Sequence, residues 1–293
     1  MLQTTTGGNT SLAAGGWRPV RRAEGKYNKA ASTAELQCAP VRGPRRFAIR
    51  ALRACMPLVL AMSVARMASA QSPTAGADVD VVSRYVWRGV PYSDGAAVQP
   101  SVWTSVDALT FTLWSNLVIG DRIDRGRFNH VFVSATSRID AGRLTIEPGV
   151  QAYHTKAFGE VAAVTTAESV VRISTGAGAF RIFTNHSVDL HAYRGAYVGD
   201  AGVAHRRTIG ARAEVGTQLA VSWATARYNR AFIGVAQSAV NYASLGGHVS
   251  IHLDDRWSLR PHAEWQPIID AAVRRALRTN VFFTAGVAVS LAH

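Results

Sequence analysis

The sequence predicts an all-β fold: a transmembrane antiparallel up-and-down β-barrel of about twelve strands. Three observations predict it. From Val79 onward, apolar and polar residues alternate, and a period of two is typical of strands. The alternating segments match or exceed the length of about 9–11 residues that a transmembrane strand needs. The connections between them are short and long in turn, as in bacterial outer-membrane barrels with short periplasmic turns and longer extracellular loops.

The alternation is clearest in three segments. In 109–119, Leu109, Phe111 and Leu113 fall on one face and threonines on the other. Segments 143–154 and 257–267 alternate in the same way, and so does the end of the chain. Extending this pattern along the chain predicts strands at 79–89, 97–106, 109–119, 128–138, 143–154, 166–174, 179–187, 195–205, 209–227, 239–252, 257–267 and 280–291.

The connections favour a barrel over its main alternative, a soluble secreted β-sandwich. We expect tight turns at 107–108, 140–142, 175–178, 206–208 and 253–256, and longer connections at 88–97, 120–127, 155–165, 188–194, 228–238 and 268–279. In residues 209–225 the large apolar side chains stay on one face of the predicted strand over its whole length. The strands of soluble proteins are usually only about 5–6 residues long. An even number of strands with both ends on the short-turn side also fits a barrel.

The positive charge belongs mostly to the first 70 residues. They hold 11 of the 32 lysines and arginines and 2 of the 19 acidic residues, so residues 71–293 keep 21 and 17, a net charge of +4. The overall charge of +13 therefore does not indicate nucleic-acid binding.

The first 70 residues divide into two parts. Residues 44–70 join a basic region, an apolar run and Ala68-Ser69-Ala70, which is the plan of a secretory signal peptide cleaved before Gln71. A short amphipathic helix of the mature protein is the alternative. Residues 1–43 lack an apolar period, so we expect them to be disordered or to precede the true start of translation. The barrel then comprises residues 71–293 and lies in the bacterial outer membrane.

Aromatic residues near strand ends are expected to form interface girdles. Trp114 is the exception. It falls on the polar face of its strand, so we expect its side chain to fill the interior of the barrel. The girdle candidates are Tyr85, Trp87, Trp103, Trp223, Tyr228, Trp257 and Trp265.

Three short motifs carry a family resemblance that extends over most of residues 78–291. They are residues 82–90 (VSRYVWRGV) with 93–95 and 99–101, residues 223–234 (WATARYNRAFIG), and residues 259–264 (LRPHAE). The chain resembles the TorF-like family of outer-membrane β-barrel proteins, and is loosely similar to the MipA/OmpV scaffolding barrels. The resemblance implies an outer-membrane location and a porin-like or scaffold function.

The sequence offers little for catalysis or cofactor binding. Both cysteines, Cys38 and Cys55, lie in the first 55 residues, and no nucleotide-binding loop or zinc motif is present, so we expect no cofactor and no metal. One catalytic alternative is an outer-membrane lipid hydrolase in which His248 activates Ser250. Their parity, however, points both side chains into the lumen, and we expect no catalytic residue.

The charged residues on polar parity are expected to form a lumen network of facing ion pairs. Its members are Arg84, Arg88, Glu168, Arg172, Glu214, Arg260 and Glu264. We therefore expect a non-enzymatic outer-membrane barrel, either a narrow channel for small solutes with a weak anion preference or a structural scaffold. Outer-membrane lipid and lipopolysaccharide are its expected partners, and nucleic acid is not. The sequence leaves the oligomeric state open.

Overall fold

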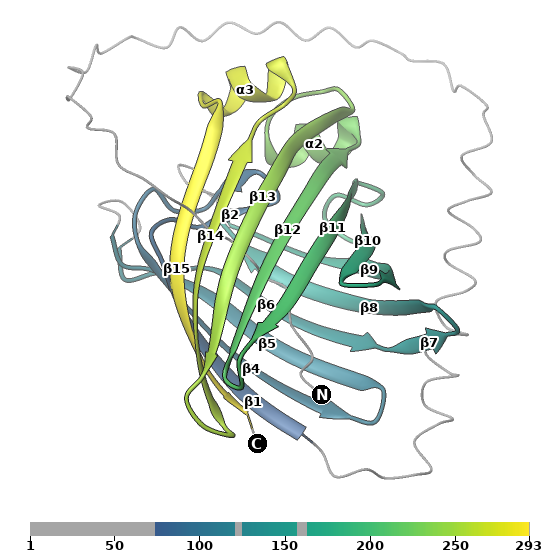
Figure 1. Ribbon diagram of the computed structural model, residues 1–293. Coiled ribbons are helices and arrows are strands. Elements are labelled where there is room, and N and C mark those ends of the chain that lie inside the picture. The colour runs from purple at the N-terminus through teal and green to yellow at the C-terminus, as the bar shows by residue number, and fades with distance from the viewer. Residues whose placement is uncertain (1–73, 121–124, 157–162, 293) are drawn as a thin grey trace, which may run out of the picture.

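The computed structural model describes residues 74–120, 125–156 and 163–292, and it shows a closed antiparallel barrel of twelve strands (Figure 1). The ring closes because β1 pairs with the last strand, β15, on one side and with β4 on the other. The wall strands are β1 (Thr74–Val82), β4 (Ala97–Val106), β5 (Leu109–Val118), β6 (Phe128–Ser137), β8 (Leu144–Thr155), β9 (Val164–Ala177), β10 (Phe180–Asp189), β11 (Tyr197–Ile209), β12 (Ala213–Ala224), β13 (Ala239–His252), β14 (Trp257–Pro267) and β15 (Val281–Ala292). The predicted fold class is confirmed, and the β-sandwich alternative is wrong because one sheet closes on itself.

Five further elements complete the fold. A short strand, β7 (Ile139–Ala141), extends the β6–β8 hairpin, and β2 (Val86–Trp87) and β3 (Val90–Pro91) form a separate two-stranded sheet. Helices α2 (Ala226–Phe232) and α3 (Ala271–Leu277) lie in two of the longer connections. None of the helices in the described residues is long and apolar enough to cross a membrane.

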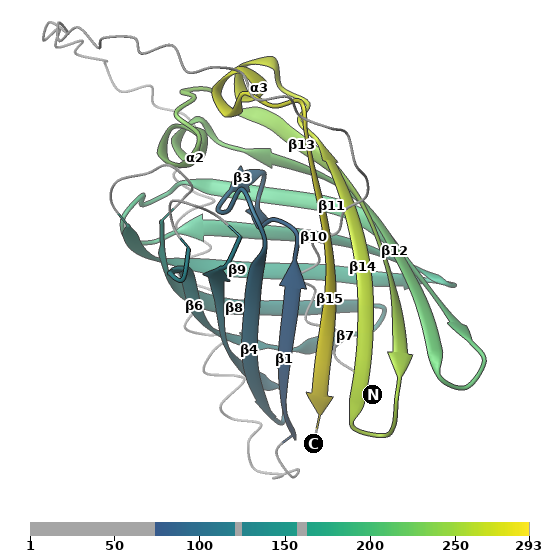
Figure 2. The same ribbon diagram turned by 90° about the vertical axis from the view of Figure 1, so that its left-hand side faces the viewer.

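The two ends of the barrel differ. Tight connections such as 107–108 and 178–179 join strands at one end, the turn side, where Gly76 pairs with Ala292. The longer connections, with both helices, lie at the other end, the loop side (Figures 1 and 2). The alternation of short and long connections that the sequence predicted is therefore present.

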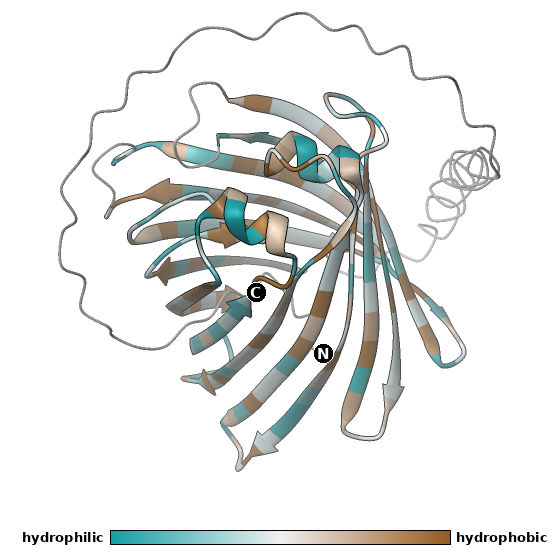
Figure 3. Cartoon of the chain, turned by 90° about the horizontal axis from the view of Figure 1, so that it is seen from above, coloured by the Kyte–Doolittle hydropathy of each residue, from teal (hydrophilic) through white to brown (hydrophobic). Residues whose placement is uncertain are grey.

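The outer surface of the wall is apolar. Val102, Leu219 and Leu245 leave 51%, 56% and 51% of their surface exposed, whereas their strand neighbours of opposite parity face the lumen. Bands of alternating hydropathy along the strands show this pattern from above (Figure 3). An outward apolar face is expected where lipid, and not water, surrounds a barrel.

The turn predicted at 206–208 is wrong, because β11 continues through these residues to Ile209 and the turn lies at 210–212. The strand predicted after it and the first predicted strand also differ in extent from the structure. The segment 209–227 contains the end of β11, a turn at 210–212, β12 and the start of α2. Ile209 pairs with Ala213 across three turn residues, so odd positions face outward on both strands and the alternation runs through the turn. Gly210, with φ of 63°, supplies the left-handed conformation there.

The first predicted strand, 79–89, ends at Val82. The chain then leaves the wall, and residues 83–96, hereafter the inner segment, fold into the barrel. Alternation alone does not distinguish this path, because a hairpin inside the lumen has the same period of two as a wall strand.

Candidate functional site

The inner segment carries a minimal hairpin into the lumen. Strands β2 and β3 are joined by Arg88 and Gly89, whose φ values are 53° and 76°. Positive φ at both central residues defines a type I′ turn, which matches the twist of a two-residue hairpin. A Cβ on Gly89 would meet the Tyr242 ring of β13 at 2.7 Å, so the tip needs glycine for its close approach to the far wall. Figure 2 shows β3 within the loop-side end of the barrel.

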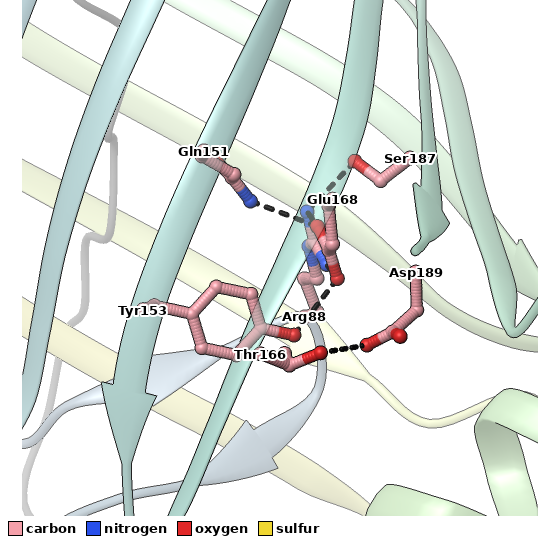
Figure 4. A network of polar contacts seen from close by, with 7 residues as sticks. All are labelled: Arg88, Gln151, Tyr153, Thr166, Glu168, Ser187 and Asp189. Carbon is pink, nitrogen blue, oxygen red and sulfur yellow. Dashed lines mark hydrogen bonds and ion pairs between the residues drawn. The ribbon is translucent and has the colours of Figure 1, made fainter. Parts of the chain in front are cut away.

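Arg88, at the tip of this hairpin, forms a buried ion pair with Glu168 of β9 (Figure 4). Its two terminal nitrogens donate to the two Glu168 oxygens, both at 2.9 Å, and one also donates to Ser187 Oγ at 2.8 Å. The Arg88 and Glu168 side chains are 16% and 2% exposed. Burial alone would lower the pKa of Arg88, but the Glu168 carboxylate raises it well above its usual value. Arg88 therefore stays charged.

Residues of the wall hold the Glu168 carboxylate independently of Arg88. Gln151 Nε2 donates to one oxygen at 2.8 Å and the Tyr153 hydroxyl to the other at 2.8 Å. Both residues lie on β8, and Gln151 is the cross-strand neighbour of Glu168. A nearby bond, from Thr166 to Asp189, links β9 to β10 at 2.7 Å (Figure 4).

Aromatic side chains surround the base of the hairpin. The Trp87 ring lies 4.2 Å from Arg88 Cζ, a cation–π contact, and packs edge-on against the buried His130 at 4.7 Å between centroids. His130 Nδ1 lies 3.0 Å from the Tyr85 hydroxyl. Trp114 stands inside the lumen against Tyr85, with centroids 5.3 Å apart, so its predicted interior position is confirmed.

Several expected girdle residues lie inside the barrel instead. Tyr85 and Trp87 belong to the inner segment, Trp103 lines the lumen, and Tyr228 of α2 is 1% exposed. By contrast, Trp257 and Trp265 are exposed on the outer face. The first group was misassigned because aromatic residues fill a closed loop-side end as readily as they mark an interface.

Apolar clusters close the loop-side end of the lumen. One joins Val86 of the inner segment to Val273 of α3 and Phe282 of β15. Another packs Tyr228 of α2 against Val198 and Ala224 at the ends of β11 and β12. The inner segment and the two helices therefore form a plug at this end.

On the turn side of this plug, the lumen holds a cavity of about 940 Å³. It extends from Trp87 and Arg88 to residues of the turn side such as Gly178 and Arg206. This volume lies at the upper end of the roughly 300–1,000 Å³ of small-molecule sites. Both signs of charge line it, with arginines at 88, 138, 172, 181, 206 and 260 and acidic residues at 78, 80, 147, 200 and 264.

The structure brings together only some of the seven predicted network residues. Arg88 and Glu168 pair directly. Arg260 and Glu264 line the cavity from the same strand, β14. Arg172 also lines it, with Nε 3.8 Å from Glu147 Oε2 and its guanidinium 4.9 Å from the Phe183 ring centroid.

The other two predicted network residues, Glu214 and Arg84, lie apart from these five. Glu214 Oε1 lies 3.1 Å from Arg206 Nε, an ion pair near the turn side, where the two side chains are 22% and 44% exposed. Arg84 pairs with Asp94 at 2.5 Å within the inner segment, at an exposed position. Thus the ion pairs are local pairs spread over the barrel rather than one continuous network.

Sequence reasoning missed the partners that complete the site. Gln151, Tyr153 and Ser187 share lumen parity with Glu168, but the predicted network comprised charged residues only. It also missed Asp80, whose carboxylate lies 2.8 Å from His262 Nε2 across the β1–β15–β14 wall. Extending the network to the amides, hydroxyls and remaining carboxylates of lumen parity would have found these residues, although not their pairing.

His248, the base of the hydrolase alternative, faces the lumen, as predicted, and lines the cavity. The imidazole Nε2 is buried without a hydrogen-bond partner, and no hydrogen bond to Ser250 occurs in the described residues. Within those residues, no group of three potential ligands is placed to hold a metal ion.

No family model and no curated protein matches the chain, so the resemblance to the TorF-like family stays a prediction. The fold is similar to solved outer-membrane barrels. The NanC porin matches with a TM-score of 0.48 and 14% identity over 73% of this chain and 98% of that one. The KdgM porin gives 0.46 and 8% over 74% and 98%, and an outer membrane channel from Pseudomonas putida F1 gives 0.45 and 9% over 75% and 95%. These likenesses are too distant to carry a function to this chain.

Proposed function

We propose that the protein is a non-enzymatic outer-membrane barrel that acts as a narrow channel for small solutes. The observation that carries the proposal is a cavity of about 940 Å³, lined by charged side chains of both signs, inside a closed wall whose outer face is apolar. In this proposal residues 44–70 direct export, and the apolar face contacts outer-membrane lipid and lipopolysaccharide. The alternative function for the same barrel is that of a structural scaffold.

A channel explains the interior better than a scaffold does. A barrel that only braces the membrane gains nothing from a large cavity with charges of both signs, since each charge loses hydration there. Charged and polar groups lining a pore instead set which solutes enter. The plug at the loop side implies that passage requires movement of the inner segment.

Single-channel recording in planar bilayers tests this proposal. The full chain is expressed, and the barrel is purified from the outer membrane and compared with a variant in which residues 85–92 are replaced by a short glycine–serine linker. We expect rare or small steps for the natural barrel and larger, more frequent steps for the variant. Absence of steps in both proteins, with each shown by gel mobility to be folded, would support the scaffold instead.

A further inference from the structure

We propose that the wall around Glu168 is a binding site for the guanidinium group of a solute, and that Arg88 is its tethered occupant. The site, hereafter the Glu168 pocket, consists of Gln151, Tyr153, Glu168 and Ser187. This inference rests on the proposed channel and names the class of solute that would open it.

The geometry of the Glu168 pocket suits a planar guanidinium. Two parallel N–H groups meet the two carboxylate oxygens at 2.9 Å, and a further bond goes to Ser187 Oγ at 2.8 Å. This forked pattern is the one that guanidinium makes with carboxylates, whereas an ammonium group is a compact point charge without the fork. The pocket therefore favours guanidinium over amine solutes.

The pocket is preformed by the wall. Its members lie on the neighbouring strands β8, β9 and β10, and Gln151 and Tyr153 orient the carboxylate without help from the inner segment. A site built on paired strands keeps its geometry when a loop moves away. Departure of Arg88 would thus leave a carboxylate already positioned for the next cation.

The backbone of the β2–β3 hairpin contributes little to holding Arg88 in the Glu168 pocket. The hairpin contains only two residue pairs, and a short isolated hairpin is marginal in water. Arg88 also adopts a φ of 53°, which is unfavourable for a residue other than glycine. Its attachment therefore depends on the ion pair, the aromatic contacts and the apolar packing of Val86. A free guanidinium would make the same ion pair without the backbone strain.

Competition sets the concentration at which a solute acts. A group on a short tether has an effective concentration in the millimolar range, so a guanidinium solute must reach a similar concentration to displace Arg88. Once Arg88 is displaced, the inner segment loses its ion pair with β9, and the solute stands at the head of the cavity. Recognition and opening are then one event.

Chemical rescue tests the pocket without reference to conduction. The variant Arg88→Ala empties the pocket, so its barrel should unfold in detergent at a lower temperature than the natural one, as read from the gel mobility of folded and unfolded forms. Millimolar methylguanidinium should restore part of the lost thermal stability, and methylammonium should restore less. The double variant Arg88→Ala/Glu168→Gln should show no rescue, and Arg206→Ala, which disrupts an exposed ion pair, should show none either.

Two results would overturn the proposal: no rescue of Arg88→Ala by methylguanidinium, or equal rescue when Glu168 is also replaced. If Arg88→Ala does not insert into the membrane, Arg88→Met takes its place, because it keeps the apolar contact with Trp87. A separate recording distinguishes the pocket from the channel. Rescue in a barrel that never conducts would reject the channel and keep the pocket, and conduction without rescue would do the reverse.

Discussion

Replacing Glu168 by glutamine should detach the inner segment while leaving the barrel wall intact. The change preserves shape but removes the charge that faces Arg88, whose side chain is only 16% exposed. Breaking a buried ion pair by removing one partner costs about 3–5 kcal/mol. Because a glutamine can still accept one hydrogen bond from Arg88, we expect the lower end, about 3 kcal/mol, which corresponds to a roughly hundredfold rise in the detached population.

Thiol labelling measures this population. In a chain with Cys38→Ser and Cys55→Ser, the substitution Val90→Cys places a single thiol in the hairpin, where the side chain is 3% exposed. A maleimide reagent reaches it only when the inner segment is detached, so the labelling rate follows the open population when opening and closing are fast. Glu168→Gln should raise that rate by about two powers of ten.

Glu214→Gln is the matched control. Its ion pair with Arg206 joins side chains that are 22% and 44% exposed, and such pairs contribute about 0–1 kcal/mol. We expect its labelling rate to stay within about fivefold of the parent. Equal labelling rates in the Glu168→Gln variant and the parent would refute the conclusion that this ion pair holds the segment in the lumen.

Three further predictions follow from the wall and its charges. Closed barrels resist detergent until heated, so the membrane-extracted protein should migrate differently before and after boiling, and identical mobility would contradict a closed barrel. Gly202→Ala should lower the unfolding temperature by an amount equivalent to about 1–3 kcal/mol, because its Cβ would meet Leu219 O at 2.3 Å. Gly176→Ala, where a Cβ meets nothing within 4 Å, is the control and should change little. Reversal potentials in a potassium chloride gradient should show a weak anion preference that falls as salt rises. Arg181→Glu should shift it toward cations, and cation selectivity of the natural barrel would reject this prediction.

The strands of the wall could be predicted closely from the sequence. Three of them, 97–106, 239–252 and 257–267, have the predicted bounds, because each is bordered by turn residues that break the alternation. Where the alternation is not broken, as at Gly210, the turn was predicted at 206–208 instead of 210–212, because three turn residues preserve the parity of both strands. Parity also placed the side chains of Glu168, Arg172 and His248 on the lumen face, since successive residues of a strand point to opposite sides.

By itself, the sequence therefore determined a period of two, the alternation of short and long connections, and an apolar outer face, which together specify a membrane barrel. These are local properties, set by the backbone geometry of each strand and by the lipid or water that each face meets. Only the tertiary structure decided that residues 83–96 leave the wall and that Arg88 meets Glu168, 80 residues further along the chain. Closure of the ring brings β9 opposite the end of β1, and the alternation of residues within a strand carries no information on which strands will face each other across the lumen.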